Sequence, residues 1–176
     1  GVSIANPLQG MTIGEIGVVY EALLALSNRR NRKARGQYFT PDDVASFMAQ
    51  QAATFQEGRW LDPCCGVGNL SWHLAAAMPS PGDFVREHLA LGDIDPTALK
   101  TAVALIVASF APIGDLTVLP GLSGRAVVAD YLGGKDLPSH DYVLMNPPYA
   151  ATSVRPKFRT GKTREMFAYF LERAAA

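Results

Sequence analysis

Four short apolar segments alternate with helical patterns along this chain, and this alternation constrains the fold more than any other feature. The segments are apolar and end in turn residues, as expected of strands buried on both faces of a parallel sheet; they cover residues 59–64, 88–94, 126–131 and 141–145. Helices are predicted over residues 12–28, 69–78, 96–110 and 163–175, with another starting at Thr40-Pro41. We therefore predict an α/β fold with four parallel strands in the order 3-2-1-4 and flanking helices.

Apolar residues at helical spacing identify the side chains that we expect to be buried. In the helix over 12–28 they are Ile13, Ile16, Tyr20, Leu23 and Leu24; in the helix after Pro41 they are Val44, Phe47, Met48 and Phe55; in the last helix they are Met166, Phe167, Phe170 and Leu171. Thr40 is expected to cap the helix that follows it through its side chain.

The composition excludes several classes of protein. The chain has 176 residues and is 48% hydrophobic, which suits one globular domain and is too apolar for a disordered chain. Its longest apolar run, residues 102–113, is shorter than the roughly 20 residues of a membrane-spanning helix, and no secretion signal is expected. The two cysteines, Cys64 and Cys65, are adjacent and predict no disulfide framework, so a cytoplasmic location is expected.

The net charge of zero hides two basic segments. Residues 29–35 carry five basic side chains, residues 155–164 carry another five, and neither segment contains an acid. The rest of the chain holds 6 basic and 16 acidic residues, a formal charge of −10. Two basic segments on an acidic body are typical of an anion-binding surface, although solvated loops also carry such runs.

Aspartates end three successive predicted strands, at Asp62, Asp93 and Asp130. The ends of parallel strands share one edge of a sheet, where an acid after the second strand commonly binds ribose hydroxyls. Asp95 precedes a proline at a helix start and is expected to be the N-cap, which leaves Asp93 as the ribose candidate. Three carboxylates at one edge predict a nucleoside-sized pocket that disfavours phosphate.

The loop over residues 62–69 contains Gly66 and Gly68, which would let the backbone approach a ligand at a helix N-terminus. Ser71 stands where the dinucleotide fingerprint needs a third glycine, so the loop alone is also compatible with an ordinary strand-to-helix turn. Gly161-Lys162-Thr163 resembles the end of a phosphate-binding loop, but Pro156 replaces the required first glycine. Cys64, Cys65 and His73 lack the spacing of a zinc site, and no metal site is predicted.

The fourth predicted strand leads into Asn146-Pro147-Pro148-Tyr149. Two prolines hold this loop rigid, and neither has an N–H group, so the carbonyl groups around them remain acceptors. The Asn146 side-chain oxygen and the Pro147 carbonyl could accept both hydrogens of an exocyclic amino group, while Tyr149 offers a face for stacking. Such acceptors would favour a tetrahedral nitrogen whose lone pair can attack a methyl donor.

Together these motifs resemble the catalytic domain of DNA adenine-N6 methyltransferases, in the gamma class, where the cofactor motifs precede the catalytic one. The corresponding segments are residues 36–41 for the first cofactor motif, 62–68 for the glycine loop, 92–96 for the ribose motif, 129–131 for the adenine segment and 146–149 for the catalytic tetrapeptide. The resemblance covers about residues 34–175. It implies a partial Rossmann-like S-adenosylmethionine-dependent methyltransferase fold over residues 36–176, preceded by a helix and basic segment over residues 1–35.

The resemblance also implies a role for each motif. S-adenosylmethionine would lie along the strand ends, with Thr40 and Asp62 near its methionine part, Asp93 at the ribose, Asp130 at the adenine amino group, and Ile94 and Tyr131 on either side of the adenine. The full cofactor set is Phe39, Thr40, Asp62, Pro63, Gly66, Asp93, Ile94, Asp130 and Tyr131. Asn146, Pro147 and Tyr149 would act on an adenine flipped out of DNA. Substrate contacts would come from Pro148, Tyr149, Arg32, Lys33, Arg35, Arg155, Lys157 and Arg159.

Other functions remain open at this stage. The tetrapeptide also occurs in enzymes that methylate a glutamine amide of release factors or a guanine amino group of RNA, and a non-catalytic cofactor-binding or DNA-binding remnant would carry the same motifs. The Thr40 motif and the basic segments favour DNA, in bacterial restriction-modification or phage defence. Four strands would leave an apolar sheet edge, so we expect a further segment, subunit or second copy to complete the sheet, and a specificity module elsewhere.

Overall fold

The structure is a computed structural model that describes residues 10–27, 39–55, 58–112, 114–115, 117–134, 136–153, 155 and 157–176. Its strands are β1 (Trp60–Asp62), β2 (Leu89–Asp93), β3 (Ala126–Val128) and β4 (Tyr142–Val143). They form one parallel sheet in the order β3-β2-β1-β4, with Trp60 opposite Leu89 on one side and Tyr142 on the other. The predicted fold class and strand order are confirmed, although each strand is shorter than its apolar segment.

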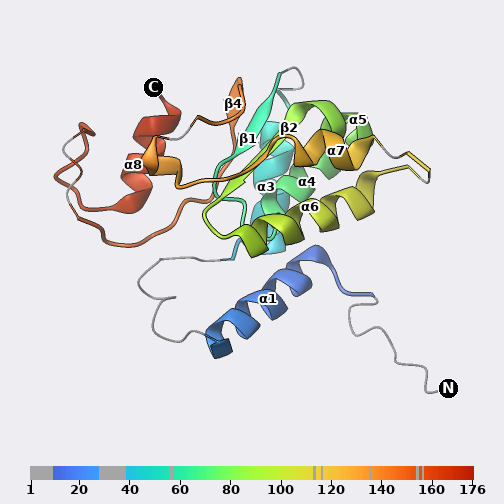
Figure 1. Ribbon diagram of the computed structural model, residues 1–176, viewed down its shortest axis with the longest axis horizontal. Coiled ribbons are helices and arrows are strands. Elements are labelled where there is room, and N and C mark those ends of the chain that lie inside the picture. The colour runs from blue at the N-terminus through green and yellow to red at the C-terminus, as the bar shows by residue number, and fades with distance from the viewer. Residues whose placement is uncertain are drawn as a thin grey trace.

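Five helices correspond to predicted ones: α1 (Ile13–Ser27), α3 (Asp42–Ala52), α4 (Asn69–Ala77), α6 (Pro96–Phe110) and α8 (Met166–Ala174) (Figure 1). The prediction missed α5 (Pro81–Asp83), the π-helical turn η1 (Phe84–His88), α7 (Val118–Ser123) and the 3-10 turn η2 (Tyr131–Gly133). Pro120 and Gly121 make α7 look like a turn in the sequence. Pro120 lies in the first helical turn, however, where a missing N–H breaks no hydrogen bond.

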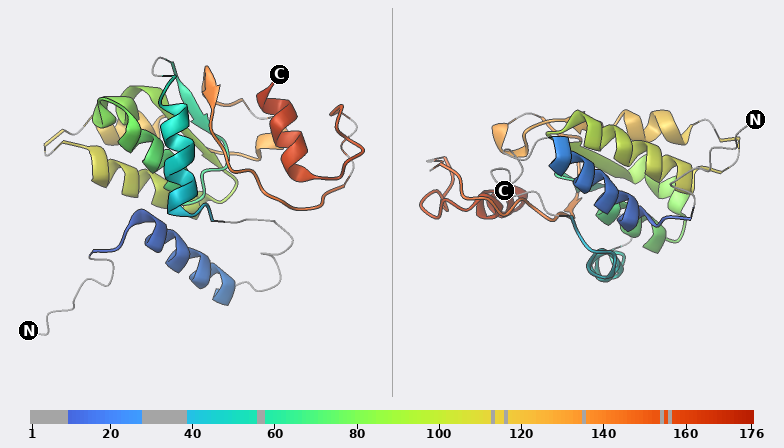
Figure 2. Two further views of the ribbon diagram at one scale, coloured as in Figure 1. Left: turned by 180° about the vertical axis from the view of Figure 1, so that it is seen from behind. Right: turned by 90° about the horizontal axis from the view of Figure 1, so that it is seen from below.

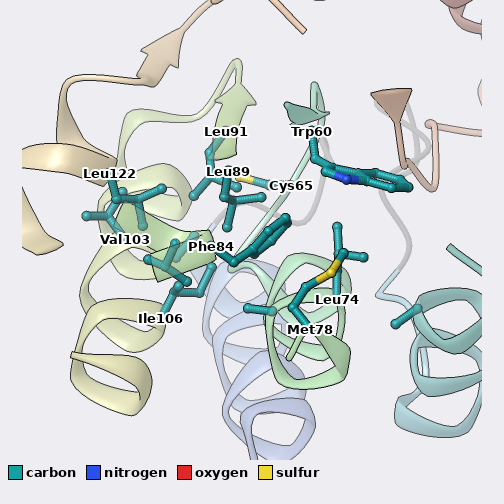
Figure 3. Close-up of a cluster of buried hydrophobic side chains, with 14 of the residues drawn as sticks. Trp60, Cys65, Leu74, Met78, Phe84, Leu89, Leu91, Val103, Ile106 and Leu122 are labelled. Carbon is teal, nitrogen blue, oxygen red and sulfur yellow. The ribbon is translucent and has the colours of Figure 1, made fainter. Parts of the chain in front are cut away.

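Successive residues of the two central strands face two different apolar clusters. Trp60, Leu89 and Leu91 point into the larger cluster, which α3, α4, η1, α6 and α7 complete (Figure 3). Leu61 and Ala90 point into a smaller cluster on the opposite face, with side chains from η2 and α8. Both faces of the sheet are therefore covered, which explains why its strands are apolar without alternation.

The apolar stripe predicted for α3 is wrong. Ala45, Ala49 and Ala52 face the core, whereas Val44 and Phe55 are exposed and Phe47 is 64% exposed. The alanines and the larger side chains both recur at helical spacing, so periodicity could not decide between the two faces. The small side chains let α3 lie close against α4. Leu23 of α1 and Leu171 of α8 are likewise exposed rather than buried, and the Leu24 side chain lies outside the described part of the chain.

Helix α1 lies below the rest of the molecule in Figure 1 and in the view from behind in Figure 2. Two glycines bring it close to the start of α3: a β-carbon on Gly14 would lie 2.2 Å from the Asp42 carboxylate, and one on Gly17 would lie 2.2 Å from the Phe39 ring. This approach carries Tyr20 to the strand ends, where its hydroxyl donates to Asp95 Oδ2 over 3.5 Å. None of the helices in the described ranges is long and apolar enough to cross a membrane.

Strand β4 forms one end of the sheet, since β1 is its single neighbour within the described ranges. The ring of Tyr142 in β4 packs against Trp60, with ring centres 4.7 Å apart, and against Phe55 at 5.8 Å. Figure 1 and the view from behind in Figure 2 both show α8 beside this end of the sheet. Within the described part of the chain, no strand pairs with the outer backbone edge of β4.

Candidate active site

A pocket of about 360 Å³ lies at the carboxyl ends of the four strands. Its volume falls within the range of small-molecule sites. Nine of its lining residues are the ones that the sequence singled out for a cofactor: Phe39, Thr40, Asp62, Pro63, Gly66, Asp93, Ile94, Asp130 and Tyr131. The structure therefore brings this whole set together around one cavity, while the role of each residue in it stays a prediction.

The glycine loop closes the pocket between β1 and α4. Gly66 and Gly68 have φ angles of +55° and +91°, in the left-handed region that favours glycine. A β-carbon on Gly68 would lie 2.9 Å from the Ala102 side chain, so α6 packs directly on the loop. The Gly66 N–H donates to Asp93 Oδ2 over 2.8 Å and ties the loop to the end of β2.

Asp93 is buried at the end of β2, with 5% of its surface exposed. Its Oδ1 accepts from the Asp95 N–H and its Oδ2 from the Gly66 N–H, each over 2.8 Å. Burial raises its pKa, and these hydrogen bonds oppose the shift. Both oxygens keep further acceptor capacity for a ligand in the pocket. Asp95 itself caps α6, accepting from Thr97 and Ala98, as its position before Pro96 predicted.

Asp62 lies even deeper, with 3% of its surface exposed. Its Oδ2 accepts from the Ser71 hydroxyl over 2.8 Å, and its Oδ1 from the Cys64 N–H over 3.3 Å. Burial raises the pKa of Asp62 to about 7; the two hydrogen bonds oppose this shift, and the charge of Asp93 adds to it. A cation beside Asp62 would favour its ionised form, so the pocket is suited to a positively charged ligand.

The two side chains predicted to enclose an adenine differ in accessibility. Ile94 is largely exposed, whereas Tyr131 is buried. The Tyr131 ring packs against Phe170 at a centre distance of 5.0 Å, and the Arg173 guanidinium lies over it at 4.7 Å. Asp130 is exposed beside them, and its Oδ1 accepts from the Leu132 N–H over 3.0 Å. At this end of the pocket, the Ile94 side chain is therefore accessible to solvent, whereas the Tyr131 ring is held in place by Phe170 and Arg173.

The tetrapeptide after β4 is divided between the pocket and its surroundings. Asn146 and Pro148 line the cavity, but Pro147 is buried and does not. Tyr149 is 55% exposed outside the cavity, and its ring centre lies 5.8 Å from that of Phe167 in α8. Asn146 thus reaches the predicted cofactor position, while Tyr149 lies beside the cavity on a more open surface.

Thr40 holds the Asn146 side chain, and its predicted role as a helix cap is wrong. Helix α3 begins at Asp42 without a side-chain cap. The Thr40 hydroxyl oxygen instead accepts from Asn146 Nδ2 over 2.9 Å. The Cys64 thiol donates to the Asn146 backbone carbonyl over 3.5 Å; burial and the nearby acids raise the pKa of Cys64 well above its ordinary value and keep it protonated. Asn146 is therefore fixed through both its side chain and its backbone.

The second basic segment lies on a loop between β4 and α8. Arg155 lines the pocket, whereas Lys157, Arg159, Lys162 and Arg164 are exposed. An antiparallel bridge between Ala151 and Glu165 closes the loop at its base. Glu172 of α8 accepts from the Arg159 and Thr160 N–H groups over 2.6 and 2.8 Å, and Lys157 donates to the Leu132 carbonyl over 2.8 Å. The first basic segment, with Arg32, Lys33 and Arg35, lies outside the described residues.

Several lining residues were not predicted as part of a site. Tyr20 of α1, Asn69 of α4, and Met166 and Phe170 of α8 all face the pocket. Three of the four lie on apolar helix stripes, where sequence alone suggests packing, and Asn69 was expected merely to begin a helix. The one feature of the sequence that could have indicated a site residue was the position of Asn69 directly after the glycine loop.

The model of a protein family, described as N-6 DNA methylase, matches residues 12–83. Over this segment, the chain is similar to the N-6 DNA methylase family. The matched region includes α1, the Thr40 motif and the glycine loop, and it ends before the tetrapeptide. No curated protein sequence matches the chain.

Solved structures resemble the chain over most of its length. The DrdV–DNA complex has a TM-score of 0.68 and 16% identity, covering 92% of this chain and 21% of that one. A methyltransferase subunit of a type I restriction-modification system from Streptococcus thermophilus has a TM-score of 0.53 and 22% identity over 96% of this chain and 37% of that one. A Pyrococcus horikoshii protein described as an RNA methyltransferase has a TM-score of 0.53 and 19% identity, covering 88% of this chain and 67% of that one.

At these identities the structural likeness establishes the fold alone, and that fold is the Rossmann-like fold of S-adenosylmethionine-dependent methyltransferases. The chain spans 21%, 37% and 67% of the three proteins. The smallest of these shares belongs to the DNA complex, in which most of the protein has no counterpart in this chain.

Proposed function

We propose that this chain is the catalytic portion of a DNA methyltransferase that transfers a methyl group from S-adenosylmethionine to N6 of adenine. The observation that carries the proposal is the position of Asn146 at the edge of a pocket that gathers all nine predicted cofactor residues. The agreement between the pocket lining and the nine predicted residues supports S-adenosylmethionine as the cofactor. The tetrapeptide supports an amino nitrogen as the atom that is methylated. Restriction-modification or phage defence is the biological setting that we propose.

The chemistry of the pocket fits this cofactor. S-adenosylmethionine carries a sulfonium and an ammonium group, and the pocket presents the buried carboxyl groups of Asp62 and Asp93. A dinucleotide pyrophosphate would meet the same two acids unfavourably. Asp93, held by two backbone N–H groups, would accept from ribose hydroxyls without having to reorganise.

Asn146 would act on the nitrogen that is methylated. Its Nδ2 is engaged by Thr40, which leaves its Oδ1 to accept one N–H of the target amine, while the Pro147 carbonyl accepts the other. Both acceptors strengthen as the nitrogen becomes tetrahedral and positively charged, so they stabilise the transition state more than the ground state. S-adenosylmethionine, when bound, would supply an electrophilic methyl group: the N–C bond would form as the S–C bond breaks, and the nitrogen would then lose a proton to solvent.

Tyr149 and the basic loop, the segment between Ala151 and Glu165 that carries the second basic segment, would hold the DNA. The exposed Tyr149 ring would stack on a flipped base, and the exposed Arg159 and Lys162 would meet phosphates. We propose that the missing specificity contacts, and the pairing of the open β4 edge, come from a partner, a further segment or a second copy of the chain.

The test is transfer of tritiated methyl groups to DNA, RNA and a release factor in parallel, with and without added subunits. Label recovered as N6-methyladenine from the DNA supports the proposal. Label confined to a guanine of RNA or to a glutamine of the release factor would replace it with one of the other methyltransferase functions. Binding of S-adenosylmethionine without transfer to any substrate would indicate a non-catalytic module.

A further inference from the structure

Asn69, the first residue of α4, makes one hydrogen bond where its amide can make more. Its Nδ2 donates to the Thr40 backbone carbonyl over 2.7 Å. Because a carbonyl only accepts, the amide nitrogen must face Thr40, and Oδ1 must therefore point elsewhere. The residue is 4% exposed and lines the pocket. Among the described residues, nothing donates to the buried Oδ1.

An unsatisfied buried amide oxygen is unfavourable, and native proteins retain few of them. The contact with Thr40 uses only the amide nitrogen of Asn69. It therefore does not explain why a buried amide oxygen is present at the start of α4. Asn69 lines a pocket rather than a closed core, so a hydrogen-bond donor on a ligand in that pocket is a possible partner for its oxygen. The free acceptor thus makes Asn69 a candidate ligand-binding residue.

The neighbours of Asn69 indicate which donor it receives. S-adenosylmethionine has three kinds of N–H or O–H group: the adenine amino group, the ribose hydroxyls and the α-ammonium group. Asp130 and Asp93, at the ends of β3 and β2, are proposed for the first two. Asn69 instead contacts Thr40, and Ser71, two residues further along the chain, donates to Asp62. Thr40 and Asp62 are the residues proposed for the methionine part.

We propose that Asn69 Oδ1 accepts a hydrogen bond from the α-ammonium group of the cofactor. This inference rests on the proposed function and adds a binding residue that the sequence motifs did not identify. The same amide holds the Thr40 carbonyl, and the Thr40 hydroxyl holds Asn146. A bound ammonium group therefore orders a chain of contacts that ends at the proposed catalytic amide.

Calorimetric binding of two ligands tests the contact. S-adenosylhomocysteine retains the α-amino group, and its desamino analogue replaces that group with hydrogen and leaves the rest unchanged. The wild-type chain should bind S-adenosylhomocysteine at least tenfold more tightly than the analogue, as expected for hydrogen bonds to a charged group. In Asn69→Leu this preference should fall by about tenfold or more. Gln50→Leu, which removes an exposed amide of α3, should keep it.

The preference between the two ligands, rather than either affinity, decides the outcome. Asn69→Ala serves as a second variant because it removes the acceptor without placing apolar bulk beside Thr40. A wild-type preference in both variants would overturn the inference, and so would an equal weakening of both ligands, which would make Asn69 a packing residue. A wild-type chain that binds neither ligand would instead reject the cofactor of the proposed function.

Discussion

The candidate site has a proposed cofactor half, the pocket at the strand ends, and a proposed substrate half, Tyr149 with the basic loop. The two halves differ in how far this chain alone completes them. On the cofactor side, Asp62, Asp93 and Thr40 are buried, and each is held by hydrogen bonds from the glycine loop, α4 or the tetrapeptide. On the substrate side, Tyr149 and most of the basic loop are exposed. The first half is preorganised by the fold, whereas the second is largely exposed to solvent.

The difference follows from the positions of the strands. β1 and β2 are the central strands and are covered on both faces. The residues at their ends are therefore held in place by the packed sheet. β4 is a two-residue strand at the end of the sheet, and the tetrapeptide follows it. Asn146 joins the halves, because it follows the edge strand but is anchored to Thr40 on the cofactor side. Variants that act on one half should therefore spare the other.

Asn146→Ala should have the largest effect, since it removes the acceptor at the reacting nitrogen. We expect turnover to fall by about 100-fold to 1,000-fold, as for other preorganised polar groups at a reacting centre, with little change in S-adenosylmethionine affinity. Methyl-transfer kinetics and calorimetry, in a preparation with measurable wild-type activity, separate the two quantities. Methylation of adenine by this variant at the wild-type rate would reduce the tetrapeptide to a structural turn.

Asp62 should make the stability of the ligand-free chain depend on pH. Its pKa is about 7 in the folded chain and near 4 when unfolded, so its stabilising contribution is complete below about pH 4 and is lost as the pH rises through 7. Asp62→Asn should remove this dependence, a difference on the order of 2–4 kcal/mol between pH 4 and 8. Urea unfolding of both proteins across that range measures it. If the free energy of unfolding changed with pH equally in the wild-type chain and in Asp62→Asn, Asp62 would be more hydrated than its burial implies.

Asp93→Ala should weaken S-adenosylmethionine binding by about 1.5–3 kcal/mol, the usual value of hydrogen bonds to a charged group. The effect should appear in the dissociation constant from calorimetry. Asp136→Ala, which removes an exposed acid outside the pocket, is the matched control and should bind normally. An unchanged affinity in the Asp93 variant would exclude this residue from the site.

Tyr149 should act on the substrate half alone. Tyr149→Ala removes the ring and should cost about 1–3 kcal/mol of base capture, seen as a lower kcat/KM for DNA. Tyr149→Phe keeps the ring and should retain most of the activity. Cofactor affinity should be unchanged in both. If the Phe variant were as slow as the Ala variant, the hydroxyl rather than the stacking face would be the functional group.

The smallest effect is expected from the basic loop. Arg159→Gln with Lys162→Gln should weaken DNA binding evenly across sequences. The slope of log affinity against log salt concentration should fall by roughly 1 for each phosphate that the variant no longer neutralises. Lys100→Gln, an exposed change on α6, provides the control. A salt dependence equal to that of the wild-type chain would leave the loop without a role in DNA binding.

The features that could be predicted are those that local sequence patterns encode. Strand order and the line of acids at the strand ends follow from apolar runs that stop at turn residues, and Asp95 caps α6 as its position before Pro96 indicated. The buried face of α3 could not be chosen, because two sets of residues share helical spacing. The Thr40 contact with Asn146 joins residues 106 positions apart, and no local pattern encodes such a pair.

The Ala151–Glu165 bridge has a consequence for how this molecule can vary. It brings together the ends of the basic loop before any ligand arrives, so residues inserted between them need not disturb β4 or α8. Loop-closure entropy grows only with the logarithm of length, and doubling such a loop costs about 0.6 kcal/mol. An insertion at the exposed Lys162, away from Arg155, could therefore change the proposed DNA contacts while leaving the candidate pocket as it is.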